Sequence, residues 1–257
     1  MEITNEMWIS ALIGAIIGSI IIPILYEFCK KLVNWYKNSR PARKVFESIL
    51  DQGESCKIFI RDFFIDTKTE LYTYVPKEGN KIVPNIYELW ADSDARAATN
   101  IFNVLGRIGK TKNIELRKNS QDFGEWNTNI IIIGAHSSKS KEFFNIMDNV
   151  TYRIDAENII DNISNEKIKR EDGFGYGIIV KAKNPYKIGK KNGTGFLIGG
   201  FGTLGTEAAT YYFRENYIKL GSEFGRKYFG IIVRAKASAG PDSVQRINKF
   251  DKVIKGS

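Results

Sequence analysis

The sequence is poor in the residues that build metal centres and disulfide frameworks, with one histidine and two cysteines among its 257 residues. Cys29 and Cys56 cannot form the several bridges of a disulfide-stabilised secreted domain, and they suit a reducing compartment. Zinc sites use three or four cysteine or histidine ligands, so no metal site is expected. Internal repeats, low-complexity segments and a recognisable nucleic-acid-binding module are also missing, which makes a nucleic-acid partner unexpected.

Charge is missing from one long stretch of the chain, because residues 7–26 contain no acidic or basic side chain. A helix of this length rises about 30 Å, which matches the hydrocarbon core of a bilayer. The stretch is apolar on all faces, and Trp8 and Tyr26 stand near its ends, where aromatic side chains meet a membrane surface. The sequence therefore predicts a single transmembrane helix over residues 7–28.

The two flanks of this stretch differ in charge. Glu2 and Glu6 precede it, whereas no acid stands between Glu27 and Glu47 and that interval carries Lys30, Lys31, Lys37, Arg40, Arg43 and Lys44. Positive flanks face the cytoplasm and attract anionic lipid headgroups. We therefore expect a single-pass protein of the cytoplasmic membrane, with its N-terminus outside and its domain in the cytosol. A cleaved signal peptide and a buried helix of a soluble domain are the alternatives.

Small residues recur along the predicted membrane helix. Gly14 and Gly18 form a G-x-x-x-G pattern, which lets two helix backbones approach closely in lipid. The pattern predicts self-association and a homo-oligomer. The alternative is that small residues are simply common in membrane helices.

The rest of the chain has the length of one sizeable domain. We divide the sequence into an extracytoplasmic N-terminus (1–6), the transmembrane helix (7–28), a basic juxtamembrane helical connector (29–52), a cytosolic domain (53–240) and a basic tail (241–257). The net charge is +9, and the positive residues spread through the domain favour an acidic ligand such as a nucleotide.

Short apolar runs alternate with helical spacings along the domain. Strands are predicted over 56–64, 71–75, 114–116, 129–133, 176–181, 195–198 and 228–234, and helices over 94–106, 140–147 and 204–217. The alternation indicates a Rossmann-like, mainly parallel α/β sandwich of about six or seven strands, in which residues 149–175 form an insertion of unassigned structure.

A glycine-rich loop follows the strand predicted over 195–198 and opens the next helix. It fits the pattern G-x-G-x-x-G, in which glycines permit close approach of a phosphate and amides at the helix start donate to it. We expect ligand contacts from Gly199, Gly200, Gly202, Thr203 and Gly205. The alternative is a glycine-rich turn that only packs.

Charged residues flank this loop. The last predicted strand ends with Arg234 and Lys236. A site for NAD is expected to have an acidic residue here to bind the ribose, whereas these cations suit a phosphate. Glu207 is the candidate catalytic acid if the protein is an enzyme. Its other role is to complement the helix dipole.

A second loop, after the strand predicted over 129–133, carries polar residues at an equivalent place. Ligands of open α/β sheets bind beyond the carboxyl ends of the strands. We therefore expect contacts from Gly134, Ser137, Ser138 and His136, the only histidine, with Asp94 on the rim. Catalysis by His136, a plain loop role for that residue, and helix capping by Asp94 are the alternatives.

The glycine-rich loop resembles the P-G-G-x-G-T-x-x-E signature of the lysine-decarboxylase-like phosphoribohydrolases, enzymes that cleave N-glycosidic bonds of nucleotides. The matching residues are Gly199, Gly200, Gly202 and Thr203. Ile198 replaces the proline, Glu207 comes one residue late, and the family's paired arginine motif is not evident. The resemblance implies a carboxylate near the ribose of a nucleotide.

The wider pattern of strands and loops is similar to that of prokaryotic Rossmann-like nucleotide-binding domains. A membrane helix joined to such a domain also resembles, in architecture, the membrane-anchored nucleotide-signalled effectors of bacterial antiphage systems. Three hypotheses follow. The protein is a membrane-anchored sensor whose nucleotide ligand alters helix association, an enzyme that hydrolyses an N-glycosidic bond of NAD or a nucleotide, or a non-binding membrane scaffold. The sensor hypothesis requires no cofactor.

Overall fold

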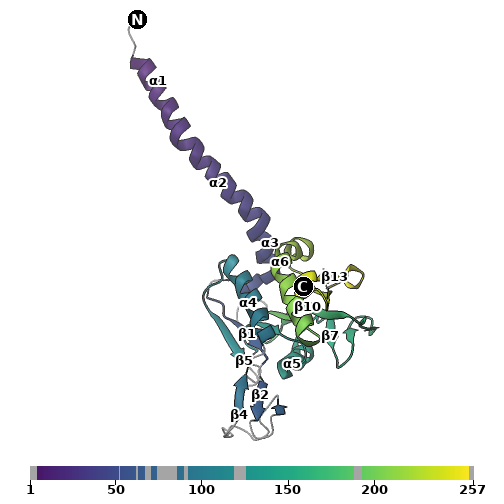
Figure 1. Ribbon diagram of the computed structural model, residues 1–257. Coiled ribbons are helices and arrows are strands. Elements are labelled where there is room, and N and C mark those ends of the chain that lie inside the picture. Colours follow the sequence, from purple (N-terminus) through teal and green to yellow (C-terminus); the bar gives the residue numbers. More distant parts are fainter. Residues whose placement is uncertain are drawn as a thin grey trace.

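The computed structural model describes residues 5–51, 53–61, 63–66, 71–73, 86–89, 92–118, 126–187 and 193–254. It contains a mixed α/β domain at the end of a long N-terminal helical segment (Figure 1). The predicted α/β class is thereby confirmed. Residues 1–4 and 74–75, which belong to the predicted extracytoplasmic segment and to a predicted strand, lie outside the described residues.

The helices of the N-terminal segment are α1 (Asn5–Ile16), the π-helical η1 (Ile17–Ile21), α2 (Ile22–Asn34), the π-helical η2 (Trp35–Ser39), α3 (Arg40–Phe46) and the 3-10 turn η3 (Glu47–Leu50). Those of the domain are α4 (Asp92–Arg107), α5 (Ser138–Ile146), α6 (Gly202–Phe224) and the 3-10 turns η4 (Pro241–Ser243) and η5 (Asn248–Phe250). The strands are β1 (Cys56–Ile60), β2 (Phe63–Asp66), β3 (Leu71–Thr73), β4 (Ile86–Leu89), β5 (Ile114–Lys118), β6 (Asn129–Ile133), β7 (Tyr152–Ile154), β8 (Ile159–Asp161), β9 (Lys167–Ile168), β10 (Phe174–Asn184), β11 (Gly193–Gly200), β12 (Tyr228–Lys236), β13 (Gln245–Arg246) and β14 (Lys252–Ile254).

The central sheet has the order β13-β12-β10-β11-β6-β1-β5, with β14 also paired to β12. Its strands β5, β1, β6 and β11 are parallel, whereas β10 runs antiparallel to both β11 and β12. From β1 the chain moves outward to β5 and then returns to the other side of β1 as β6. This reversal creates a topological switch point between β1 and β6, and ligands of open α/β sheets bind outside such points.

Two apolar clusters cover the two faces of the sheet. Alternate side chains of β1 and β6, among them Ile58 and Ile131, pack on one face with residues of α3, α4 and α6. Their neighbours Phe59 and Ile130 pack on the other face with α5 and the small β7-β8-β9 sheet. Burial on both faces explains why β6 contains a run of isoleucines and why β1 is mostly apolar.

Two regions differ from the sequence prediction. The strand predicted over 56–64 is divided, because β1 ends at Ile60 and β2 belongs to a separate β3-β2-β4 sheet. The insertion over 149–175 contains the antiparallel β7-β8-β9 sheet, whose strands have only two or three residues each. Strands this short carry too few side chains to show a period in the sequence.

The segment predicted to cross a membrane is helical, but the transmembrane prediction is not supported. The segment runs through α1 of 12 residues, the π-helical η1 of 5 and α2 of 13. In the part of the chain that the structure describes, no helix combines the length and the apolar character needed to span a bilayer.

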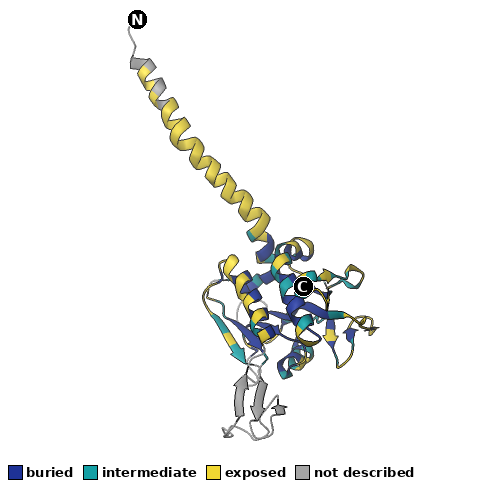
Figure 2. Ribbon diagram, viewed as in Figure 1, coloured by how far each residue is buried: buried dark blue, intermediate teal, exposed yellow. Residues whose placement is uncertain are grey.

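The same segment projects away from the domain and exposes its side chains (Figure 2). Large apolar residues on it are 43–66% exposed, among them Ile20, Ile24 and Tyr26. A β-carbon added at Gly14 or Gly18 would meet nothing within 4 Å. Self-association through these glycines stays a prediction.

The second half of the predicted connector belongs to the domain core. Pro41, Ala42, Val45 and Phe46 of α3 are buried, and the Phe46 ring lies 5.6 Å from that of Phe213 in α6. α3 and α6 approach so closely at Gly221 that a β-carbon there would lie 2.5 Å from the carbonyl carbon of Pro41. The N-terminal helical segment is thus fixed to α6.

Candidate functional site

The candidate site lies at the carboxyl edge of β1, β6 and β11, beside the switch point. Helix α5 begins shortly after β6 ends, and α6 begins shortly after β11 ends. The start of α4 reaches the same edge, because Arg61 Nε, just beyond β1, lies 3.2 Å from Asp94 Oδ2 in the first turn of α4. Three helix N-termini therefore converge here. The first turn of α4 already carries Asp92 and Asp94, so the partial positive charges at the starts of α5 and α6 are the ones left to favour an anion.

Three of the predicted glycine contacts serve packing. A β-carbon on Gly199 would lie 2.5 Å from the carbonyl carbon of Gly134, and one on Gly200 would lie 2.6 Å from the carbonyl carbon of Gly205. The amide of Gly200 also donates to Thr206 Oγ1 at 3.2 Å. These glycines let β11, α6 and the loop after β6 approach closely, which is the role that the packing alternative assigns to them.

The exposed part of the loop starts at Gly202. This glycine has a φ of +62°, and a β-carbon there would meet nothing within 4 Å. Thr203 beside it is exposed, and the N-cap residue of α6, Phe201, makes no side-chain capping hydrogen bond. The start of α6 is the part of the glycine motif that remains open to a ligand.

In the loop after β6, the predicted serine contact is occupied. Ser137 is the N-cap of α5, and its Oγ accepts a hydrogen bond from the amide of Ser140 at 3.1 Å. Ser140 Oγ in turn donates to the carbonyl oxygen of Gly134 at 2.7 Å, and Gly134 has a φ of +95°. Ser138 is half-buried as the first residue of α5. The hydroxyl of Ser137 therefore stabilises its own helix.

His136 stands between the two loops. Its ring lies 5.4 Å from the ring of Phe201, measured between centroids. Partial burial lowers the pKa of the imidazole, and the nearby Arg61, Arg170 and Lys141 lower it further, while Asp155 opposes them. Because the pKa lies below its ordinary value, the ring is neutral at pH 7 and serves as a hydrogen-bonding group in a field of cations.

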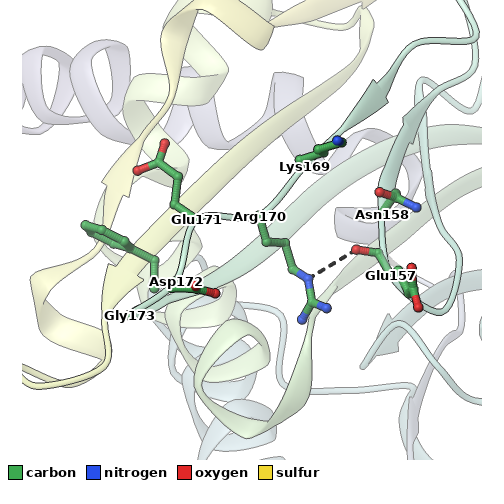
Figure 3. Close-up of a pocket in the computed structure, with 8 residues that line it drawn as sticks. Glu157, Asn158, Lys169, Arg170, Glu171, Asp172 and Gly173 are labelled. Atoms are coloured by element: carbon green, nitrogen blue, oxygen red, sulfur yellow. Dashed lines mark hydrogen bonds between the residues drawn. The ribbon is translucent and has the colours of Figure 1, made fainter.

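Arg170 is a site residue that sequence reasoning missed. It comes from the chain between β9 and β10, and its Cζ lies 4.1 Å from the centroid of the Phe201 ring. Its Nε donates to the backbone oxygen of Glu157 at 3.1 Å, which fixes the side chain above an open cavity of about 450 Å³ (Figure 3). No sequence signal pointed to it, because it lies in the insertion.

Arg61 was also missed, although its position directly after a buried strand was a usable signal. Its partner Asp94 is 1% exposed, and burial raises the pKa of this carboxyl although Arg61 opposes the shift. Asp94 therefore holds Arg61 at the edge of the sheet.

Glu207 is bound within the fold. It is 8% exposed, and its Oε1 lies 2.7 Å from Nη2 of Arg96 in α4. Arg96 also pairs with Asp92. Glu207 thus joins α6 to α4, and its catalytic role stays a prediction.

Arg234 and Lys236 lie at the end of β12, two strands from β11 and so about 10 Å away across the sheet. Arg234 pairs with Glu171 at 2.7 Å and lies over the Phe174 ring. Lys236 is exposed. The structure therefore gathers Gly202, Thr203, His136, Arg61 and Arg170 at one place. Arg234 lies next to the cavity beside Arg170, because Glu171 and Phe174 line that cavity.

Comparison with known proteins adds no assignment. No protein-family model matches the chain, and no curated protein sequence matches it.

Proposed function

We propose that this protein binds an anionic nucleotide at the carboxyl edge of β1, β6 and β11 and acts as a sensor held at a membrane. The observation that carries the proposal is the convergence of three helix N-termini with Arg61 and Arg170 beside the switch point. Helix dipoles and guanidinium groups both favour phosphate.

The shape of the edge supports a phosphate at the start of α6. Gly202 leaves open space at the helix N-terminus, where amides point outward. Arg170 stands on the Phe201 side of this loop, and the neutral His136 offers a hydrogen bond to a ribose or phosphate oxygen. The nucleotide base has room in the cavity beside Arg170.

Binding without hydrolysis is favoured by the position of Glu207. A general acid or base must be free to reach the substrate. The Glu207 carboxylate is instead bound by Arg96, whose Nε and Nη2 lie 2.8 Å and 2.7 Å from Oε1. The sensor hypothesis is therefore preferred over the N-glycosidase hypothesis.

Membrane attachment is proposed from the exposed N-terminal segment. The apolar side chains that the structure describes on α1 and α2 are exposed, and exposed apolar surface of this extent normally meets lipid or another protein. Replacing Ile20 and Ile24 by Lys should move the full chain from the membrane pellet to the supernatant of lysed cells. A chain that is equally soluble before and after the substitutions would refute membrane attachment.

The ligand site is tested by adding a negative charge at the start of α6. Thr203→Glu places a carboxylate near the helix N-terminus, where it stabilises the helix but repels a phosphate. Affinity for ATP, AMP or NAD, whichever the wild type binds in calorimetry, should fall at least about tenfold, which corresponds to about 1.4 kcal/mol.

Two controls accompany this variant. Thr203→Gln has a similar size without the charge and should bind nearly as the wild type does. Ser222→Glu adds the same charge on an exposed position near the other end of α6 and should also bind normally. If Thr203→Glu binds as tightly as these controls, or if the wild type binds none of the three nucleotides at low salt, the proposed site is wrong.

A further inference from the structure

Exposed cations from two distant parts of the sequence meet at the opposite, amino edge of the sheet. We name this set the basic collar, and it consists of Lys37, Arg40, Arg43, Lys44, Arg226 and Lys227. The first four lie on η2 and α3, at the base of the N-terminal helical segment, and the last two lie in the turn between α6 and β12. All are exposed except Lys44, which is half-buried.

A buried lysine brings the two parts of the collar together. Lys181 in β10 is 0% exposed, and its Nζ lies 3.2 Å from the carbonyl oxygen of Lys44 and 3.4 Å from that of Arg226. The backbones of these two residues therefore lie within about 7 Å of each other, as the sum of two hydrogen-bond lengths requires. Glu47 Oε1, 3.0 Å from the same nitrogen, compensates the buried charge.

The collar retains its positive charge. Within the described part of the chain, none of its six cations forms an ion pair with a carboxylate. The acids nearby have other partners, because Glu47 binds Lys181 at 3.0 Å and Glu223 binds Arg246 at 2.7 Å. Such a cluster attracts a polyanionic surface, and it does so within about 10 Å at 0.1 M salt.

We propose that the basic collar docks on the anionic headgroups of a lipid bilayer. The apolar surface that adjoins it selects this partner, because Phe28, Leu32, Val33, Trp35 and Tyr36 are 46–61% exposed on the helical segment that leads into the collar. A lipid surface offers an apolar interior beside a plane of negative charge, whereas a nucleic acid offers the charge alone. The proposal rests on the membrane attachment proposed above.

Docking in this way fixes the orientation of the domain. Arg226 and Lys227 belong to the domain itself, so the amino edge of the sheet faces the lipid. The nucleotide site at the carboxyl edge then faces away from it, open to ligand from the aqueous side.

The test is co-sedimentation of the full chain with two kinds of vesicle, phosphatidylcholine alone and phosphatidylcholine doped with phosphatidylglycerol. The double variant R226E/K227E should bind the neutral vesicles as the wild type does. The additional affinity that phosphatidylglycerol gives the wild type should fall at least about tenfold, and raising the salt concentration should remove the difference.

The matched control is K167E/K249E. These lysines are exposed and line one cavity with Arg234, at the carboxyl side of the sheet. The control also replaces two cations by two glutamates, so its net charge changes by the same amount. It should keep the response to phosphatidylglycerol, and thermal melting of both variants checks the fold. Equal losses in the two variants, or no loss in R226E/K227E, would overturn the collar proposal.

Two further outcomes separate this proposal from the membrane attachment. If the wild-type chain does not bind neutral vesicles but binds anionic ones, and R226E/K227E loses that binding, insertion of the apolar segment is refuted and the collar proposal is supported. If R226E/K227E instead weakens binding to duplex DNA and leaves vesicle binding unchanged, the collar serves a nucleic acid and the lipid proposal is overturned.

Discussion

The two ends of α6 use glycine in opposite ways. At the N-terminal end Gly202 adopts a left-handed conformation with open space above it. At the C-terminal end Gly221 has ordinary helical geometry and lies against the backbone of Pro41, with no space for a side chain. One end is left free to receive a ligand, whereas the other is fixed to the N-terminal helical segment. A glycine in a sequence does not reveal which of these roles it has.

The largest effect is expected at the packed end. Gly221→Val would force side-chain atoms into the Pro41 backbone, which overpacks the α3–α6 contact and should cost about 3 kcal/mol of unfolding free energy in denaturant titrations. Ser222→Val, one residue further and exposed, is the control and should change stability little. Equal stability of the two variants would show that α3 does not pack on α6 as described.

A smaller effect is expected at the open end. Gly202→Ala places a β-carbon on a residue with a φ of +62° and should cost about 1 to 2 kcal/mol, although no atom is in the way. Gly202→Asn should cost less, because asparagine tolerates the left-handed region. If alanine and asparagine prove equally neutral, the positive φ at the start of α6 is refuted.

Glu207 tests how far the open end extends along α6. Glu207→Gln removes the charge of the pair with Arg96, whose side chain is 61% exposed, so the loss of stability in denaturant titrations should be small. Nucleotide affinity should stay unchanged in calorimetry. A variant that still binds but no longer releases base or nicotinamide from a nucleotide that the wild type cleaves would instead establish the N-glycosidase hypothesis.

The smallest expected effect concerns the pH dependence of stability. Because the pKa of His136 is lowered in the folded state, the unfolded chain binds this proton first. His136 should therefore cost stability as the pH falls from about 6.5 through the lower folded pKa, and it should have no effect above that window. His136→Gln should flatten the stability curve below pH 6.5 in thermal melts. Identical curves for the two proteins would contradict the lowered pKa.

Much of the fold could be predicted from local patterns. The strand at 129–133 is found at the predicted residues, because a buried parallel strand is an unbroken apolar run. The helix predicted over 94–106 is found as α4, since its buried face recurs at helical spacing. The apolar run at 7–26 predicted a helix, which is found, but the predicted membrane span is not supported.

The site was only partly predictable, because its cations come together through tertiary contacts. The glycine motif indicated the carboxyl edge of the sheet, but it did not distinguish the packing glycines from Gly202. Arg170 reaches Phe201 from the β9–β10 connection, and Arg61 is held by Asp94 across the gap between β1 and α4. Contacts of this kind leave no period or spacing in the sequence.

The contacts of Lys181 also bear on how far the N-terminus of this protein can be truncated. Its ammonium group is neutralised by Glu47 and has no other counter-ion among the described contacts than this carboxylate, while the carbonyl oxygen of Lys44 also binds it. Both partners precede residue 53, the predicted start of the domain. A fragment that starts at residue 53 would lose both of these partners of Lys181 together with the buried side chains of α3, so we expect it to be less stable than one that begins near residue 40. A fragment meant to keep this domain folded should therefore include α3.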